Sequence, residues 1–324
     1  MNDSSHRSAR RAGGYALAAV AVLIVVVGLA AIVGIGPFDS GASSSPDATG
    51  ESVGDVKAAA GDLAGIVDRL AAGMSRSDFY EIPSESDRSR LARAFSAVRK
   101  GRLTRAAALA RSLGYRVVRF TDRPTGRKLV LLADRPLDRH GWGLYVHSPK
   151  SRSRVIVEIA HPKADIKSEK VGVETFRRAN AADLFMAGAH RYAAPGGASD
   201  VAHEPGTVFY AINRVAISPR AIVFQPHGFD AEARTSQFGE IVVSSGGPPT
   251  KLAESLAARL GALGYDTCLY RRGHCEGLGA TTNVEGQAVS SVGGSFVHLE
   301  MARGLREKRA SRERIASVVA KTLR

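Results

Sequence analysis

Apolar residues recur along this chain with several spacings, and each spacing predicts a different element. Residues 16–35 run for twenty positions without a charge, enough for a helix to cross the roughly 30 Å core of a bilayer. Residues 53–74 carry Ala, Leu and Val at helical spacing. A second helix is expected to start near residues 83–87 and end before Gly101, and a third to cover 103–113. The last two predict a small helical hairpin.

From residue 115 the pattern changes to short β-type runs that later alternate with helices. Such alternation predicts a largely parallel or mixed sheet covered on both faces, which is a three-layer α/β/α sandwich. The expected helices include 171–180 and 251–263, and further helices close the chain. The expected strands are 115–120, 128–132, 143–146, 154–160, 183–188, 221–225, 240–244, 265–270 and 295–300.

The amino-terminal residues predict the compartment in which the rest of the chain lies. Arg7, Arg10 and Arg11 precede the long apolar run, so the positive-inside rule places the rest of the chain outside the cytoplasm. The run exceeds the about 7–15 apolar residues of a secretory signal, which favours an uncleaved anchor over a cleaved signal or a buried soluble helix. The expected organisation is a cytoplasmic basic segment (1–14), a transmembrane anchor (15–37), a flexible linker (38–52), a helical region (53–114) and an α/β domain (115–324).

Composition narrows the classes of partner. The 45 basic and 31 acidic residues give a net charge of +14, which suits an anionic partner such as a carboxylate, a phosphate or a membrane surface. Aromatic residues make up only 6% of the chain, which argues against a surface that stacks nucleic-acid bases. Two cysteines, Cys268 and Cys275, exclude a four-cysteine zinc finger. Outside the cytoplasm a disulfide between them is expected, and a metal site with His274 is the weaker alternative.

Polar residues follow several of the predicted strands. His161 follows RVIVEIA, His190 and Arg191 follow DLFMAGA, His227 follows AIVFQP, and Glu300 follows SFVHL. Ligands of open α/β sheets bind beyond the carboxyl ends of the strands. These side chains are therefore expected to meet in one cleft.

Two histidines and a carboxylate at such a cleft predict a zinc site with an open position for water. The expected ligands are His161, His227 and Glu169, the last near the start of the 171–180 helix. Asp165 is an alternative ligand, or a partner that orients an imidazole. Gly228 is expected to allow a tight turn beside the site.

An open zinc site also needs a base and a group that stabilises negative charge. Glu300 is the expected base, although a salt bridge to Arg303 or Arg306 is an alternative role. Arg191 is expected to bind a substrate carboxylate or an oxyanion. Residues that could support the site from the glycine-rich loop or the last strand are His190, Asp200, His203 and His298.

At these positions the chain resembles the N-formylglutamate amidohydrolase and poly-γ-glutamate hydrolase group, which is similar in fold to the zinc carboxypeptidases. The resemblance covers about residues 140–310, through HPKADIKSE, GAHR, QPHGFD and HLEMARGLR. It implies an α/β/α sandwich with a mixed sheet and one catalytic zinc held by His161, Glu169 and His227. It further implies that Glu300 activates water and that Arg191 holds an acidic substrate.

The leading hypothesis is a membrane-anchored, extracytoplasmic zinc hydrolase that cleaves an amide bond of a peptide, γ-glutamyl or N-acyl amino acid. An alternative is an inactive binding protein of the cell envelope that keeps the hydrolase fold. A third possibility uses residues 303–324, which hold eight Lys or Arg and two Glu, to bind nucleic acid or anionic lipid. Placement outside the cytoplasm argues against nucleic acid, so the expected partners are the bilayer and an acidic substrate.

Overall fold

The computed structural model describes residues 56–134, 140–230 and 238–324. The basic segment, transmembrane anchor and linker predicted over residues 1–52 lie outside the described residues. Among the helices that are described, none combines the length and the apolar character needed to span a membrane.

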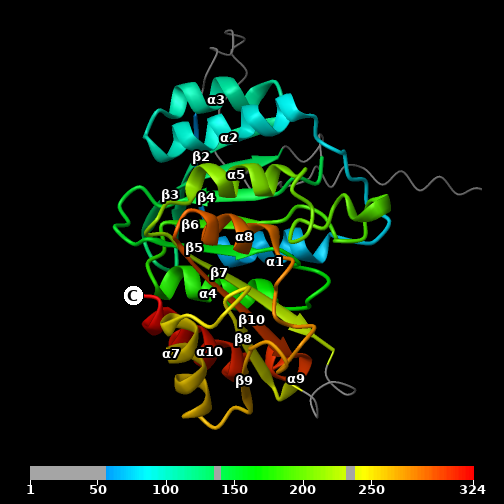
Figure 1. The fold of residues 1–324 in the computed structure, drawn as a ribbon. Helices are drawn as coiled ribbons and strands as arrows, with labels where there is room; N and C mark the ends of the chain where they lie inside the picture. The colour runs from blue at the N-terminus through cyan, green and yellow to red at the C-terminus, as the bar shows by residue number, and fades with distance from the viewer. Residues whose placement is uncertain (1–55, 135–139, 231–237) are drawn as a thin grey trace, which may run out of the picture. The chain divides into compact units, whose positions relative to one another are not determined.

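A single ten-stranded sheet organises the described chain (Figure 1). Its strand order is β1-β2-β3-β4-β6-β5-β7-β10-β8-β9. The strands are β1 (Lys57–Gly61), β2 (Tyr115–Asp122), β3 (Arg127–Asp134), β4 (Leu144–His147), β5 (Val155–Ile159), β6 (Asp183–Met186), β7 (Ile222–Phe229), β8 (Ile241–Ser244), β9 (Thr267–Leu269) and β10 (Ser295–Ala302).

Four neighbouring strands form a parallel centre in this mixed sheet. β6 pairs with β5, β5 with β7, and β7 with β10, all in parallel. The flanking strands β4 and β8 run antiparallel to β6 and β10. The prediction of a mixed, mainly parallel sheet is confirmed, and the carboxyl ends of four adjacent strands lie at one edge.

Helices cover both faces of the sheet, because strand residues alternate between two apolar cores. In β5, Val155 and Val157 enter the core with α1, α4, α7 and α10, while Ile156 enters the core with α2, α3, α5 and α8. These helices are α1 (Leu63–Ala72), α2 (Glu85–Arg99), α3 (Leu103–Arg111), α4 (Ser168–Arg178), α5 (Val208–Ala216), α7 (Lys251–Gly261), α8 (Val284–Ser291) and α10 (Arg309–Thr322). The short α9 (Arg303–Glu307) and the 3-10 turn η1 (Pro195–Gly197) complete the elements.

The prediction of a helix over residues 53–74 is wrong for its first half. Lys57–Gly61 is β1, which pairs in parallel with β2 along residues 118–122. Alanine favours a helix by intrinsic propensity, but sheet hydrogen bonds at the open edge of β2 outweigh a preference of a few tenths of a kcal/mol per residue. α1 then begins after Asp62, whose side chain accepts a hydrogen bond from the amide of Ala64.

The predicted helical hairpin is confirmed as α2 and α3. Ser84 and Asp87 form a reciprocal capping box at the start of α2. Leu91, Phe95 and Val98 bury in the same core as Ala106 of α3. The hairpin is therefore part of the helical layer on one face of the sheet.

Candidate metal centre

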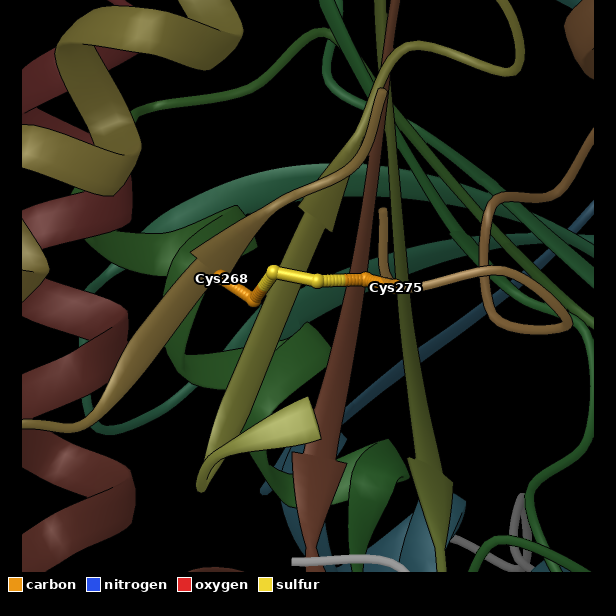
Figure 2. Close-up of a disulfide and its surroundings, with 2 residues drawn as sticks. All are labelled: Cys268 and Cys275. Carbon is orange, nitrogen blue, oxygen red and sulfur yellow. A yellow bond between two sulfur atoms is a disulfide. The ribbon is translucent and has the colours of Figure 1, made fainter. Parts of the chain in front are cut away.

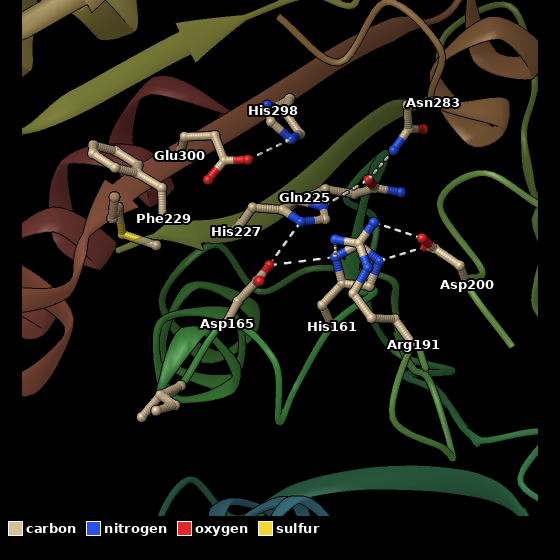
Figure 3. Close-up of polar contacts among 12 residues, drawn as sticks. His161, Asp165, Arg191, Asp200, Gln225, His227, Phe229, Asn283, His298 and Glu300 are labelled. Atoms are coloured by element: carbon tan, nitrogen blue, oxygen red, sulfur yellow. Dashed lines mark hydrogen bonds and ion pairs between the residues drawn. The ribbon is translucent and has the colours of Figure 1, made fainter. Parts of the chain in front are cut away.

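Several of the predicted site residues meet at the carboxyl edge of the parallel centre, namely His161, Asp165, Arg191, Asp200, His227, His298 and Glu300 (Figure 3). His161 lies just after β5, and Asp165 lies in the turn between β5 and α4. His227 and Glu300 lie inside β7 and β10, where they are register partners. The expected convergence of separate strand ends is thus observed, because β5, β7 and β10 are neighbours in the sheet.

Two imidazoles face one carboxylate at the centre of this group. Asp165 Oδ2 lies 2.9 Å from His227 Nδ1 and 3.4 Å from His161 Nδ1. The two ring centroids are 4.8 Å apart. The ligand atoms of these three buried residues all lie within 4.8 Å of one another. We refer to His161, Asp165 and His227 as the central cluster.

A chain of hydrogen bonds fixes which nitrogen of His227 carries its proton. The amide of Gly286 donates to Asn283 Oδ1 at 2.8 Å, so Asn283 Nδ2 donates to Gln225 Oε1 at 2.8 Å. Gln225 Oε1 is therefore an acceptor, and it lies 3.1 Å from His227 Nε2. His227 consequently carries a proton on Nε2, and its Nδ1 directs a lone pair at Asp165 when the ring is neutral.

Asp200 likewise places the proton of His161 on Nε2. Its Oδ1 lies 2.8 Å from His161 Nε2, and a carboxylate can only accept there. On the other side of the ring Arg191 Nη1, which can only donate, lies 3.4 Å from His161 Nδ1. When neutral, both rings therefore leave Nδ1 unprotonated, and in His161 that nitrogen faces both Arg191 Nη1 and Asp165 Oδ2. An unprotonated ring nitrogen and a carboxylate oxygen repel one another unless a proton or a metal cation lies between them, and the set fits a divalent cation.

The protonation preferences agree with this electrostatic arrangement. Burial raises the pKa of Asp165, but hydrogen bonds from His161 and His227 outweigh it and bring the pKa well below its ordinary value. Burial lowers the pKa of His161, and the carboxylates of Asp165 and Asp200 reverse the shift to an upward one. The pKa of His227 is lowered, because burial and the charges of His161 and Arg191 outweigh the effect of Asp165. The cluster thus favours positive charge between the rings.

Glu300 stands beside the central cluster with His298. The His298 Nε2 lies 3.7 Å from Glu300 Oε1, and the His298 ring lies 4.6 Å from the His227 ring. Burial, together with the charge of Asp165, raises the pKa of Glu300 to about 8. His298 Nδ1 and Glu300 Oε2 have no hydrogen-bond partner within the described ranges. Buried polar atoms of this kind are candidates to meet a ligand or water.

The structure brings Asp165, and not Glu169, into the central cluster. Glu169 lies in the first turn of α4, buried, and belongs to none of the metal-ligand groups found among the described residues. Burial raises the pKa of Glu169 to about 7. The physical reason is the left-handed Lys167, with φ of 67°, at which the loop turns into α4 after Asp165 has faced the cluster.

Arg191 and the residues of the glycine-rich loop surround His161. Arg191 Nη2 donates to Asp200 Oδ2 at 2.5 Å, and His203 Nδ1 lies 3.2 Å from the same oxygen. His203 is half-exposed. His190 Nδ1 accepts from the amide of Tyr192 at 3.1 Å and lies outside the clusters of metal-ligand atoms that the described chain contains.

The central cluster lies where two cavities meet. The first, of about 600 Å³, is lined by the cluster, Glu300, His298 and the loop 277–283. The second, of about 610 Å³, is lined on one side by Arg76, Lys163 and Tyr192. Both cavities share Asp165, Arg191 and Asp230. A substrate could therefore extend on both sides of the cluster.

The predicted disulfide is confirmed (Figure 2), and it closes a loop whose residue Tyr270 forms part of the wall of the first cavity. Cys268 in β9 is bonded to Cys275, with the two Cα atoms 6.7 Å apart. Tyr270 and the chain from Gly277 onward line the cavity. A Cβ on Gly279 would lie 2.3 Å from the Tyr270 ring, so the loop packs closely against this side chain.

We expect the double substitution Cys268→Ser with Cys275→Ser to loosen this wall. The free energy of unfolding should fall by about 2 kcal/mol, the effect of opening a short loop. KM for substrate should rise several-fold, while bound metal stays unchanged because no cluster residue lies in the loop. Reduction with tris(2-carboxyethyl)phosphine should reproduce the effect in the wild type and add nothing in the double variant. An unchanged KM would show that the wall does not contact substrate.

Two buried glutamates lie beneath the cluster. Gln225 Nε2 donates to Glu158 Oε2 at 2.7 Å and faces Glu285 Oε2 at 3.4 Å. Burial raises the pKa of Glu158 to about 7, and burial together with the Glu158 charge raises the pKa of Glu285 well above its ordinary value. Sequence reasoning missed these residues and Gln225, although Gln225 stands two positions before His227 and so shares its face of β7.

The raised pKa values predict a stability that falls with rising pH. The folded state keeps protons that an unfolded glutamate loses near pH 4.5, so this contribution is lost as pH rises through about 7. Glu285→Gln should therefore stabilise the protein at about pH 8, with little change near pH 4.5. Urea unfolding at both pH values measures this. The control is Glu254→Gln on exposed α7, and equal effects of both variants would contradict the prediction.

The chain is similar to several solved structures at low sequence identity. No family model and no curated protein matches this sequence. Among solved structures, gene product Atu2144 from Agrobacterium tumefaciens is 12% identical at a TM-score of 0.41, with 53% of this chain and 90% of that chain covered. Zinc-free YNDL is 15% identical at a TM-score of 0.39, with 55% and 88% covered. A bacteriophage poly-gamma-glutamate hydrolase is 14% identical at 0.37, with 53% and 82% covered. The site assignment therefore rests on the geometry of this chain.

Proposed function

We propose that this protein is a zinc-dependent hydrolase of amide bonds, with His161, Asp165 and His227 as the zinc ligands. The observation that carries the proposal is the approach of both Nδ1 atoms to Asp165 Oδ2, at 3.4 Å from His161 and 2.9 Å from His227, in a buried group of three ligand atoms within 4.8 Å of one another. Partners on the far side of each ring, Asp200 and Gln225, hold both imidazoles in this orientation. This is the arrangement by which outer residues orient histidine ligands.

The roles of the chain's own residues follow from their positions. A bound zinc ion would supply Lewis acidity toward the amide carbonyl and toward a water molecule. Glu300 would accept a proton from that water on a carboxylate oxygen and deliver it to the amide nitrogen. Arg191 would orient an acidic group of the substrate, because its guanidinium lines both cavities.

The proposed substrate is an acidic peptide, a γ-glutamyl amide or an N-acyl amino acid. Arg76, Lys163 and Arg191 around the second cavity support an anionic substrate. We further propose that residues 15–37 anchor the protein in the membrane with the hydrolase domain outside the cytoplasm. The disulfide between Cys268 and Cys275 supports an oxidising compartment.

The test is metal analysis and hydrolysis with the full-length purified protein. We expect about one zinc per chain by elemental analysis, and release of amine from γ-glutamyl or N-acyl amino acid substrates. Removal of zinc by a chelator should abolish hydrolysis, and added zinc should restore it. A folded protein that binds no zinc at micromolar concentration would overturn the proposal.

A further inference from the structure

Arg306 in α9 is a fully buried arginine next to the central cluster, with 2% of its surface exposed. Its Nε donates to the main-chain oxygen of Met301 at 2.9 Å, and its Nη2 donates to that of Phe229 at 3.1 Å. Its Nη1 donates to the main-chain oxygen of Ile166. All three guanidinium nitrogens therefore bind backbone carbonyls.

The three carbonyls belong to the segments that carry the site. Ile166 directly follows Asp165, and Met301 directly follows Glu300. Phe229 lies two positions after His227 on β7. One side chain thus joins the loop after β5 to the ends of β7 and β10.

Burial of the Arg306 guanidinium costs stability unless its fixed geometry serves a purpose. A buried guanidinium loses its hydration, and a well-packed apolar side chain of similar volume is often neutral or more stable. The described chain offers Arg306 no carboxylate within ion-pair distance, so carbonyl dipoles are its direct partners. Arginine is the side chain whose planar fork of five donors can serve three carbonyls at fixed angles.

Gly228 in β7 leaves the space that the Arg306 guanidinium occupies. A Cβ on Gly228 would lie 2.0 Å from Arg306 Nε and 2.2 Å from Cζ. Gly228 lies inside β7 and not in the tight turn that its sequence context predicted. Its absent side chain instead makes room for the guanidinium.

We propose that Arg306 is a positioning residue, which holds the segments bearing Asp165, His227 and Glu300 at the spacing that one cation requires. The inference rests on the proposed function, because it assumes that the central cluster binds a metal. Arg306 contacts neither the cluster side chains nor the cavity in the hydrogen bonds described, so it acts through the backbone.

The test compares Arg306→Met with Arg127→Met in the full-length protein. Arg127 is a matched control, because its guanidinium also donates to two carbonyls, of Phe176 and Ala181, far from the cluster in sequence and fold. We expect Arg306→Met to weaken zinc binding at least about 10-fold in a chelator competition, the scale of losing an outer partner of a metal site. Arg127→Met should lower stability and leave zinc affinity unchanged.

Two further measurements keep the test decisive if Arg306→Met folds poorly. Gly228→Ala should displace the guanidinium and weaken zinc binding in the same direction. In Arg306→Ala, millimolar methylguanidinium should restore zinc affinity and the visible spectrum of the cobalt-substituted protein. If Arg306→Met folds and binds zinc as tightly as the wild type, the role of Arg306 is overturned while the proposed function stands. The same holds if methylguanidinium gives no rescue and Gly228→Ala keeps its zinc affinity. Wild-type protein without zinc would overturn the proposed function, and zinc binding without amide hydrolysis would leave the role of Arg306 standing.

Discussion

Replacing His227 by alanine is expected to lower zinc affinity by more than about 100-fold. The substitution removes one of the two imidazoles and leaves Asp165 with the single partner His161. A three-ligand zinc site that loses one ligand no longer holds the ion against water. Elemental analysis after dialysis against a weak chelator measures the loss.

The control for this experiment is His203→Ala. His203 is half-exposed, and its contact in the site is with Asp200 at 3.2 Å. The His203→Ala variant should keep close to one zinc per chain. Equal zinc contents in the two variants would place the metal elsewhere.

The same assay decides between the two carboxylates that the sequence left open. Asp165→Asn should lose zinc, because Asp165 Oδ2 lies between the two imidazoles. Glu169→Gln should retain it, because Glu169 lies in α4 outside the central cluster. Loss of zinc from Glu169→Gln with retention in Asp165→Asn would reverse the assignment.

Glu300→Gln is expected to retain zinc and to lower kcat by about 100- to 10,000-fold, the usual contribution of a general base. Gln preserves the shape of the side chain but cannot accept the proton of water. KM should change little, because Glu300 is not assigned to substrate binding. Steady-state kinetics on an N-acyl amino acid measures both constants.

The matched control is Glu307→Gln, an exposed glutamate of α9 that pairs with Arg303 at 2.8 Å. Its kcat should equal that of the wild type. Unchanged turnover in Glu300→Gln would assign the base to another group. Ligand binding without any hydrolysis, in wild type and variant alike, would favour the envelope binding protein that the sequence also allows.

The site residues were accessible from the sequence to different degrees. His161, His227 and Glu300 each follow or end an apolar run, so the rule for strand ends was sufficient to find them. Asp165 and Glu169 could not be separated, because both lie in one irregular stretch whose turn depends on the left-handed Lys167. The sequence named Arg306 as an alternative salt-bridge partner of Glu300 and gave no sign of its backbone contacts, since an arginine in a basic carboxyl-terminal segment is usually a solvated residue.

The sequence alone determined the alternation of strands and helices and the capped hairpin of α2 and α3, because these depend on local periodicity and capping side chains. Tertiary structure decided where β1 pairs, since an alanine-rich segment takes the hydrogen bonds that the edge of β2 offers. Tertiary structure also decided the ligand set. The orientation of each imidazole depends on Asp200 and Gln225, and His161 is bound to an aspartate 39 positions away in the chain.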